Sequence, residues 1–425
     1  MKTRAIVGIN FGDEGKGRMV DYFAEHADVV VRYQGGNNAG HTVVNEHGSF
    51  ALHLLPSGIC HEGTVNIIGP GVVVNLEALW KEMAEVREKG IAITPENLVI
   101  SHRATILMPY HQEADRLEEE RLGDKKFGST MRGIAPTYGD KYLKKTLQMG
   151  HLFTPEIYAD RLKDLVEWKN ISRRGLGQPE ISYEEMKSWL DTYRELLLPY
   201  IKDVYDIYDE ASDREFLFEA QLGAMRDPDY GIFPYTTSSS PLAAYAPIGC
   251  GYPKLKLDEV LGVMKAYGTC VGEGPYVGEL EGEEASRLRE LGHEYGASTG
   301  RPRRVSYVDV VSSRYGAELQ GVDGIILTKL DVLSDYDEIP VMVAYEYKGE
   351  RLDRFPYTTI LDDCTPIYEI LPGWKEDISK VRRFQDLPQA ARDYILFLEE
   401  HLKTPIPYIS VGPARDELIV REELL

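Results

Sequence analysis

Residues 5–25 read AIVGINFGDEGKGRMVDYFAE, and this stretch decides the fold. The apolar run Ala5–Ile9 leads into the glycine-rich turn Gly12–Gly17, and the helix-like stretch Arg18–Glu25 follows directly. A strand, a glycine-rich turn and a helix in this order aim backbone N–H groups and the positive end of a helix dipole at one point, which suits a polyphosphate. The turn also carries Asp13, a carboxylate that is unfavourable among phosphates unless it holds a metal ion or removes a proton.

The turn departs from a Walker A loop, which reads GxxxxGK followed by a Ser or Thr whose hydroxyl binds magnesium. Asn10 stands at the first glycine position and Gly17 at the hydroxyl position, although Gly15 and Lys16 are kept. Lys16 can contact a phosphate. Asp13 is the nearest hard oxygen donor for a metal ion.

The amino-acid composition argues against several classes of protein. The chain has 425 residues, of which 43% are hydrophobic, and a net charge of -21, which disfavours binding to a nucleic acid. No stretch approaches the roughly 20 apolar residues of a membrane span, and residues 1–9 are too short for a secretory signal, so we expect a cytoplasmic protein. The four cysteines form no CxxC pair, which argues against a zinc site and a disulfide framework.

Short β-branched runs alternate with helical patterns, which predicts an α/β fold with a largely parallel central sheet flanked by helices. The candidate strands are Ala5–Ile9, Val29–Tyr33, Ala51–Leu55, Asn97–Ile100, Phe216–Glu219, Gly324–Thr328, Val341–Tyr345 and Tyr408–Ser410. The candidate helices are Leu76–Lys89, Tyr110–Arg121, Pro155–Trp168, Tyr183–Glu210, Leu257–Ala266 and Gln389–Leu402. Motifs run from residue 12 to residue 410, which predicts one site within a single domain, 1–425.

A second loop, Gln34–Thr42, follows the strand Val29–Tyr33 and reads QGGNNAGHT. Its three glycines and its amide and imidazole groups leave many polar groups that need partners, and a ligand rich in acceptors would supply them. A lone histidine is usually structural, but His41 follows Gly40 at a strand-end turn, a position that also suits a general acid or phosphate donor.

A third motif, Thr328–Asp331, reads TKLD and ends the apolar strand Gly324–Thr328. A carboxylate there can accept hydrogen bonds from the ring N–H and the exocyclic amine of guanine, whereas adenine would leave it unpaired. The segment Ser410–Pro413, after a late strand, can close over the same base.

Two further turns carry cations. Ser298–Arg304 places three arginines around a Gly and a Pro, and Gly128–Gly133 places Arg132 among small residues. Each turn alone could be a solvated surface charge. Together they indicate a site for several anions, such as carboxylates and phosphates.

The motifs GDEGKG, QGGNNAGHT, STGRPRR, TKLD and SVGP, in this order over the whole chain, closely resemble those of the adenylosuccinate synthetase family. The resemblance implies a P-loop-related α/β fold and a cytoplasmic homodimer. It also implies a GTP-dependent ligase that uses one Mg²⁺ per subunit and joins L-aspartate to IMP, giving adenylosuccinate, GDP and phosphate. This is the first committed step from IMP to AMP.

The resemblance also assigns the chemistry. Asp13 removes the ring proton of IMP, so that its 6-oxygen attacks the γ-phosphate of GTP, and His41 donates a proton or hydrogen bond as the phosphoryl group moves. The aspartate amine then displaces phosphate from 6-phosphoryl-IMP. Asp13 and the Gly40 carbonyl hold the metal ion.

Position by position, the resemblance implies three groups of binding residues. Those for IMP are Asp13, Lys16, Asn38, Thr130, Lys144, Gln221, Thr237 and Arg301. Those for aspartate are Thr299, Arg301 and Arg303. Those for GTP are Gly12, Glu14, Gly15, Lys16, Gly17, Gly40, Thr42, Arg303, Lys329, Asp331, Ser410 and Gly412.

The chain departs from the family pattern in the nucleotide pocket. The family's Gly-Ala-Gln-Gly appears as Ala220-Gln221-Leu222-Gly223, so either Gln221 or Leu222 occupies the glutamine position. Lys144 stands where a partner-subunit arginine usually grips the IMP phosphate, and Phe11 replaces a tryptophan. Two alternatives therefore stay open: a related ligase with a 2-amino purine nucleotide as acceptor, and a GTP-binding regulator without turnover.

Overall fold

The computed structural model describes residues 1–45, 48–210, 213–296, 300 and 302–425. Ten strands form the central sheet in the order β20-β19-β15-β11-β1-β10-β2-β5-β7-β9. Neighbours run parallel except for β19 and β20. Their bounds are β1 Lys2–Gly8, β2 Val29–Arg32, β5 Val65–Ile68, β7 Leu98–Ser101, β9 Ile201–Lys202, β10 Glu215–Glu219, β11 Glu259–Lys265, β15 Gly324–Thr328, β19 Tyr408–Ser410 and β20 Leu418–Val420.

Strand β1 lies in the middle of this sheet because its apolar residues can be buried on both faces, as parallel strands require. Ile6 packs in one buried cluster with Met19 and Val20 of the first helix. Ala5 and Val7, which alternate with Ile6 along the strand, belong to a cluster with Tyr208. The predicted fold class is therefore confirmed.

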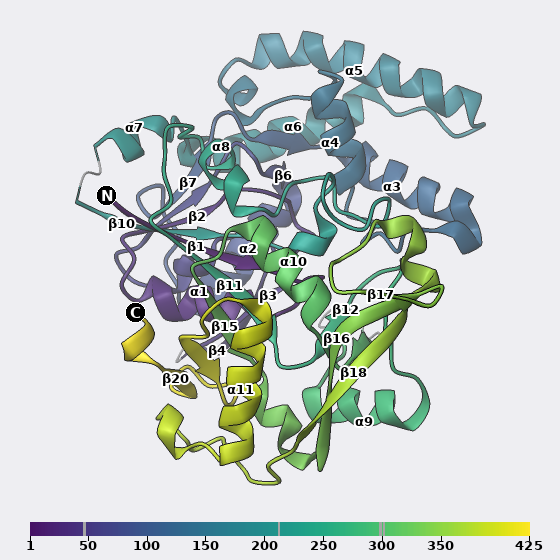
Figure 1. The fold of residues 1–425 in the computed structure, drawn as a ribbon. Coiled ribbons are helices and arrows are strands. Elements are labelled where there is room, and N and C mark those ends of the chain that lie inside the picture. Colours follow the sequence, from purple (N-terminus) through teal and green to yellow (C-terminus); the bar gives the residue numbers. More distant parts are fainter. Residues whose placement is uncertain (46–47, 211–212, 297–299, 301) are drawn as a thin grey trace.

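Helices cover the sheet, and Figure 1 shows α3, α4, α5 and α6 gathered in the upper part of the view. The helices are α1 Lys16–Ala24, α2 Leu76–Glu88, α3 Pro109–Leu122, α4 Ile134–Tyr142, α5 Pro155–Gly175, α6 Tyr183–Leu197, α7 Tyr205–Asp209, α8 Ala246–Gly249, α9 Gly282–Gly292, α10 Val310–Gln320 and α11 Gln389–Leu402. Within the described ranges, no helix is long and apolar enough to cross a bilayer.

A second sheet, at the lower right of Figure 1, joins β14 Val308–Asp309, β16 Glu338–Tyr347, β17 Glu350–Leu352 and β18 Thr365–Pro372. Three two-stranded pairs complete the strands. They are β3 His41–Asn45 with β4 Gly48–Leu52, β6 Val73–Asn75 with β8 Thr105–Leu107, and β12 Gly268–Cys270 with β13 Arg304–Ser306.

Two predicted helices are wrong. The segment predicted as the helix Leu257–Ala266 contains β11, which is hydrogen-bonded between β1 and β15 and almost wholly buried. A short apolar run buried on both faces has no periodicity that separates a strand from a helix. The long helix Tyr183–Glu210 breaks after Leu197, because Pro199 has no backbone N–H to continue the helical hydrogen bonds.

Two predicted strands lie outside the central sheet. Ala51–Leu55 overlaps β4, which pairs with β3, and Val341–Tyr345 lies within β16 of the second sheet. The other six candidate strands lie in the central sheet within a few residues of their predicted bounds. Because parallel strands end at one edge, the loops after β1, β2, β10, β11 and β15 meet there, which is where ligands bind in open α/β sheets.

Candidate active site

The loop after β1 has the backbone of a phosphate loop. Gly12 and Gly15 have φ angles of 103° and 97°, which glycine adopts without strain. The buried Glu14 carboxylate turns back into the loop, accepting from the N–H groups of Asn10 (3.2 Å) and Gly12 (2.8 Å) and pairing with Lys16 Nζ (2.5 Å). The Glu14 side chain therefore shapes the loop itself.

The missing Walker hydroxyl has a steric cause. A Cβ added to Gly17 would lie 2.8 Å from Cβ of His41, so a serine or threonine would collide with the start of β3. Gly17 thus lets the first turn of α1 pack against the second loop. A metal ligand has to come from elsewhere in the site.

Asp13 is the more exposed of the two carboxylates in this loop. Its backbone has a φ of 58°, and its side chain is 37% exposed, with Oδ2 lying 3.0 Å from Arg303 Nε. Its neighbour Glu14, by contrast, is 2% exposed. The carboxylate of Asp13 is thus the one that the turn presents outward.

His41 lies in a buried polar cluster. Its Nδ1 contacts Oε1 of Glu219, the last residue of β10, and Glu219 also accepts from the N–H (2.8 Å) and the hydroxyl (2.7 Å) of Ser57. Burial raises the pKa of Glu219, but attraction from His41 and Arg32 outweighs it, so the pKa is lowered and the carboxylate is ionised. Burial lowers the pKa of His41, and Glu219 only partly offsets this effect.

The second loop is braced against residue 221. The side chain of Gln34 donates to the Gln221 carbonyl (2.7 Å), and Gln221 Nε2 donates to the Gln34 carbonyl (2.8 Å). Gln221 is fully buried, and its Oε1 has no hydrogen-bond partner among the described residues, whereas Leu222 has a φ of 62° and is half-buried. Gln221 therefore carries one buried acceptor without a hydrogen-bond partner in the described part of the chain. Asn38 accepts from Gly36 N (3.2 Å).

The turn Gly128–Gly133 is held by two carboxylates of α3. Glu119 accepts from the N–H groups of Phe127, Gly128 and Ser129, each at 3.0 Å, and Asp115 accepts from the Ser129 hydroxyl (2.7 Å) and Gly133 N (2.8 Å). Thr130 and Arg132 remain exposed on this braced turn.

The remaining site residues that the sequence predicts lie around these loops. Gly40, Thr42 and Lys144 are exposed, and Thr237 is half-buried and donates its backbone N–H to the Arg226 carbonyl (2.9 Å). Thr299 and Arg301 lie outside the described residues.

The TKLD motif joins the phosphate loop. Thr328 Oγ1 donates to the Glu14 carbonyl (2.7 Å), and Lys329 Nζ donates to the Gly292 carbonyl (2.9 Å). Burial raises the pKa of Asp331, whose buried Oδ1 has no hydrogen-bond partner within the described part of the chain. A desolvated acceptor without a partner costs free energy, so Asp331 suits a ligand that brings donors.

The segment after β19 closes the same end of the site. Arg18 of α1 donates to the Ser410 hydroxyl and to the Glu417 carbonyl (3.3 Å), and the Ser410 hydroxyl donates to the Gly412 carbonyl (3.0 Å). The first turn of α1 is thereby tied to the loop that the sequence places over the base.

Sequence reasoning missed Glu219, which contacts His41; Arg32, whose charge acts on Glu219; and Arg18, which contacts Ser410. Glu219 carried a signal, since an acidic residue that ends an apolar strand is costly to bury without a partner. Its partner His41 lies 178 residues earlier in the chain, so only the fold brings the two together.

A parallel sheet with a glycine-rich phosphate loop, a second polar loop and a buried carboxylate oxygen without a partner among the described residues defines a P-loop-related nucleotide enzyme. Residues 5–419 match the family model described as adenylosuccinate synthetase. The chain belongs to the adenylosuccinate synthetase family. It is a GTP-dependent ligase of purine nucleotide synthesis that joins aspartate to IMP.

Relatives match over their whole length. The chain is 44% identical to the adenylosuccinate synthetase of Carboxydothermus hydrogenoformans, covering 100% of both chains. It is 43% identical to that of Halothermothrix orenii, covering 100% of this chain and 99% of the relative. The fully ligated adenylosuccinate synthetase of Plasmodium falciparum superposes with a TM-score of 0.91 at 36% identity, covering 99% of this chain and 100% of the other.

A cyanophage S-2L succinoaminodeoxyadenylate synthetase, bound to dGMP and dATP, superposes with a TM-score of 0.62 at 19% identity, covering 99% of this chain and 95% of the other. This likeness shows the fold alone. None of these comparisons favours a 2-amino purine acceptor or a regulator without turnover for this chain.

Proposed function

We propose that Asp13 and His41 catalyse the ligation and that the surrounding loops bind its three substrates. Asp13 takes the ring proton of IMP, the 6-oxygen forms a bond to the γ-phosphorus, and GDP leaves. The amine of aspartate then bonds to C6, and phosphate leaves with the 6-oxygen. The observation that carries the proposal is the 3.0 Å contact of Asp13 with Arg303, which brings the base beside the arginine for the aspartate substrate.

Mg²⁺ fits this site by donor chemistry. Asp13 supplies one outward-facing carboxylate, and Gly40, whose α-carbon faces open space, would supply a carbonyl. Mg²⁺ usually takes one or two carboxylates together with substrate phosphates and water, so a site of this kind needs no acidic cluster. When bound, the ion neutralises charge that develops on the transferring phosphoryl group.

The sequence-assigned roles remain proposals. IMP would be contacted by Lys16, Asn38, Thr130, Gln221, Thr237 and Arg301. The aspartate would be contacted by Thr299, Arg301 and Arg303. GTP would be contacted by Gly12, Glu14, Gly15, Gly17, Thr42, Lys329, Asp331, Ser410 and Gly412. The unpartnered Oε1 of Gln221 and Oδ1 of Asp331 support the two nucleotide assignments.

We also infer a homodimer and a single structural unit. Lys144, proposed to reach a partner's IMP, is exposed and follows α4, and the apolar side chains of Tyr142 and Leu143 beside it in the chain are exposed as well. The central sheet takes strands from both ends of the chain, which supports one unit over residues 1–425.

Glu219→Gln should shift the pH profile of kcat. Burial lowers the pKa of His41, and the ionised Glu219 partly offsets this effect, so Glu219 supports the protonated form that would donate to the phosphoryl group. Removing the carboxylate charge lowers the pKa of His41, and the basic limb of kcat moves to lower pH. If the basic limb of the kcat profile stays at the same pH, Glu219 does not influence proton transfer.

The overall proposal is tested with purified protein, GTP, Mg²⁺ and aspartate, offering IMP or dGMP as acceptor. We expect adenylosuccinate and GDP in equal amounts from IMP and no product from dGMP. Sedimentation velocity on the same preparation should give twice the 48.0 kDa chain mass. Product from dGMP alone, or GDP without adenylosuccinate, would contradict the proposal.

A further inference from the structure

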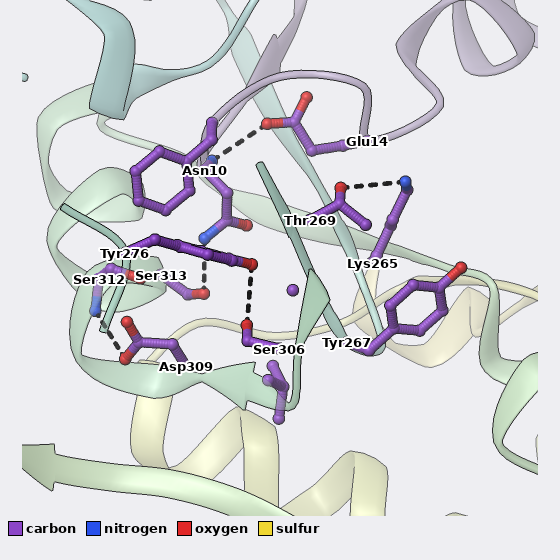
Figure 2. A pocket seen from close by; sticks show the side chains of 13 residues that line it. Asn10, Glu14, Lys265, Tyr267, Thr269, Tyr276, Ser306, Asp309, Ser312 and Ser313 are labelled. Atoms are coloured by element: carbon purple, nitrogen blue, oxygen red, sulfur yellow. Dashed lines mark hydrogen bonds between the residues drawn. The ribbon is translucent and has the colours of Figure 1, made fainter. Parts of the chain in front are cut away.

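A buried ion cluster lies beside the proposed base. Glu294, just after α9, has no exposed surface and lies between two cations. Its Oε1 accepts from Lys265 Nζ (2.8 Å) and from the Tyr267 hydroxyl (2.6 Å), and its Oε2 accepts from Arg303 Nη1 (2.6 Å). Figure 2 shows Lys265, Tyr267 and Thr269 together beside the pocket under the phosphate loop.

The cluster is anchored on the central sheet. Lys265 is the last residue of β11, next to β1, and its Nζ also bonds Thr269 Oγ1 at 3.1 Å. Burial raises the pKa of Glu294, but Lys265, Tyr267 and Arg303 lower it to about 2. The carboxylate is therefore ionised at every working pH and holds a fixed position.

Arg303 is held from two sides by this anchor. Its backbone N–H donates to the Glu294 carbonyl (2.9 Å), and its Nη1 bonds the Glu294 side chain. Its Nε faces Asp13 Oδ2 at 3.0 Å but makes no hydrogen bond in the described structure. Glu294 and Asp13 thus compete for one guanidinium, and Glu294 has the better geometry.

We propose that Glu294 is a positioning residue, which fixes the Arg303 guanidinium where the aspartate substrate meets it and keeps that cation from closing on Asp13. The inference rests on the proposed roles of Asp13 and Arg303. A guanidinium that is already oriented loses less freedom when it binds a carboxylate. Without the Glu294 charge, Arg303 turns toward Asp13, and the substrate carboxylate must displace it.

Glu294→Gln tests the proposal, because glutamine keeps the shape and removes the charge. We expect the KM for aspartate to rise about tenfold or more, the scale of a hydrogen bond to a charged group, while the KM values for GTP and IMP stay within about threefold. Calorimetric titration of L-aspartate into protein with IMP, without GTP, should show the same weakening. This binding readout does not depend on turnover, so it separates failure of the inference from failure of the proposed reaction.

Glu259→Gln is the matched control. Glu259 pairs with Arg4 at the opposite end of the same two strands, and its loss should leave aspartate affinity unchanged. Tyr267→Phe removes one hydrogen bond from Glu294 without a change of shape, and it should raise the aspartate KM about two- to fivefold. This variant decides the question if Glu294→Gln does not fold. The proposal is overturned if Tyr267→Phe binds aspartate as tightly as Glu259→Gln does. It is also overturned if the KM values for aspartate, GTP and IMP all rise equally.

Discussion

An Asp13→Asn variant should lose about 10³-fold in kcat, the middle of the range for a positioned general base. Asparagine fills the same space but cannot take the ring proton of IMP, and it is a poorer ligand for a hard cation. Arg303 would lose its 3.0 Å contact with Asp13 but keep its hydrogen bond to Glu294, so the aspartate KM should change less than kcat. Initial rates of adenylosuccinate formation at saturating substrates measure the loss.

Asp337→Asn is the control for this substitution. Asp337 also pairs with a cation, Lys375 at 3.2 Å, but it is largely exposed and belongs to no part of the site. Its variant should keep the wild-type kcat. Equilibrium binding of GTP to Asp13→Asn should persist, since backbone N–H groups and Lys16 remain. A variant that ligates at the wild-type rate would remove Asp13 from the mechanism.

The glycine-rich turns were predictable because their chemistry is local. Gly12–Gly17 and Thr328–Asp331 each follow an apolar strand in the sequence, and both strands lie where the sequence placed them. The Leu257–Ala266 segment failed because burial on both faces removes the alternation that marks a strand. That error concealed the role of Lys265, whose position at the end of β11 anchors Glu294.

The supporting carboxylates could not be predicted, for a physical reason. The buried carboxylates of Glu219 and Glu294 are stable because charged and hydrogen-bonding partners from other segments offset the free energy of desolvation. No local sequence pattern identifies those partners. The His41–Glu219 contact joins two strands of different sheets. Local signals thus indicated the residues that we propose to face ligands, while the residues that we propose to orient them became evident only from the fold.

Asp331→Asn should change which nucleotide drives the reaction. The buried Oδ1 of Asp331 has no hydrogen-bond partner among the described residues, and guanine would satisfy it with a ring N–H and a 2-amino group. Asparagine accepts one of these bonds and turns its own donors toward the other. Two hydrogen bonds to a charged group contribute about 1.5–3 kcal/mol each, so kcat/KM for GTP should fall roughly 10²-fold or more.

Xanthine presents an oxygen where guanine has its amine, so the asparagine amide complements it, and XTP should become the better substrate of Asp331→Asn. Competing GTP and XTP at equal concentration, with adenylosuccinate as the readout, measures this preference directly. Asp335→Asn, an exposed position in the same turn, is the control and should keep GTP. A site that reads a base by hydrogen bonds discriminates between nucleotides far more strongly than a site that reads only the shape of the base. Asp331→Asn that still prefers GTP over XTP would therefore show that the base is read elsewhere.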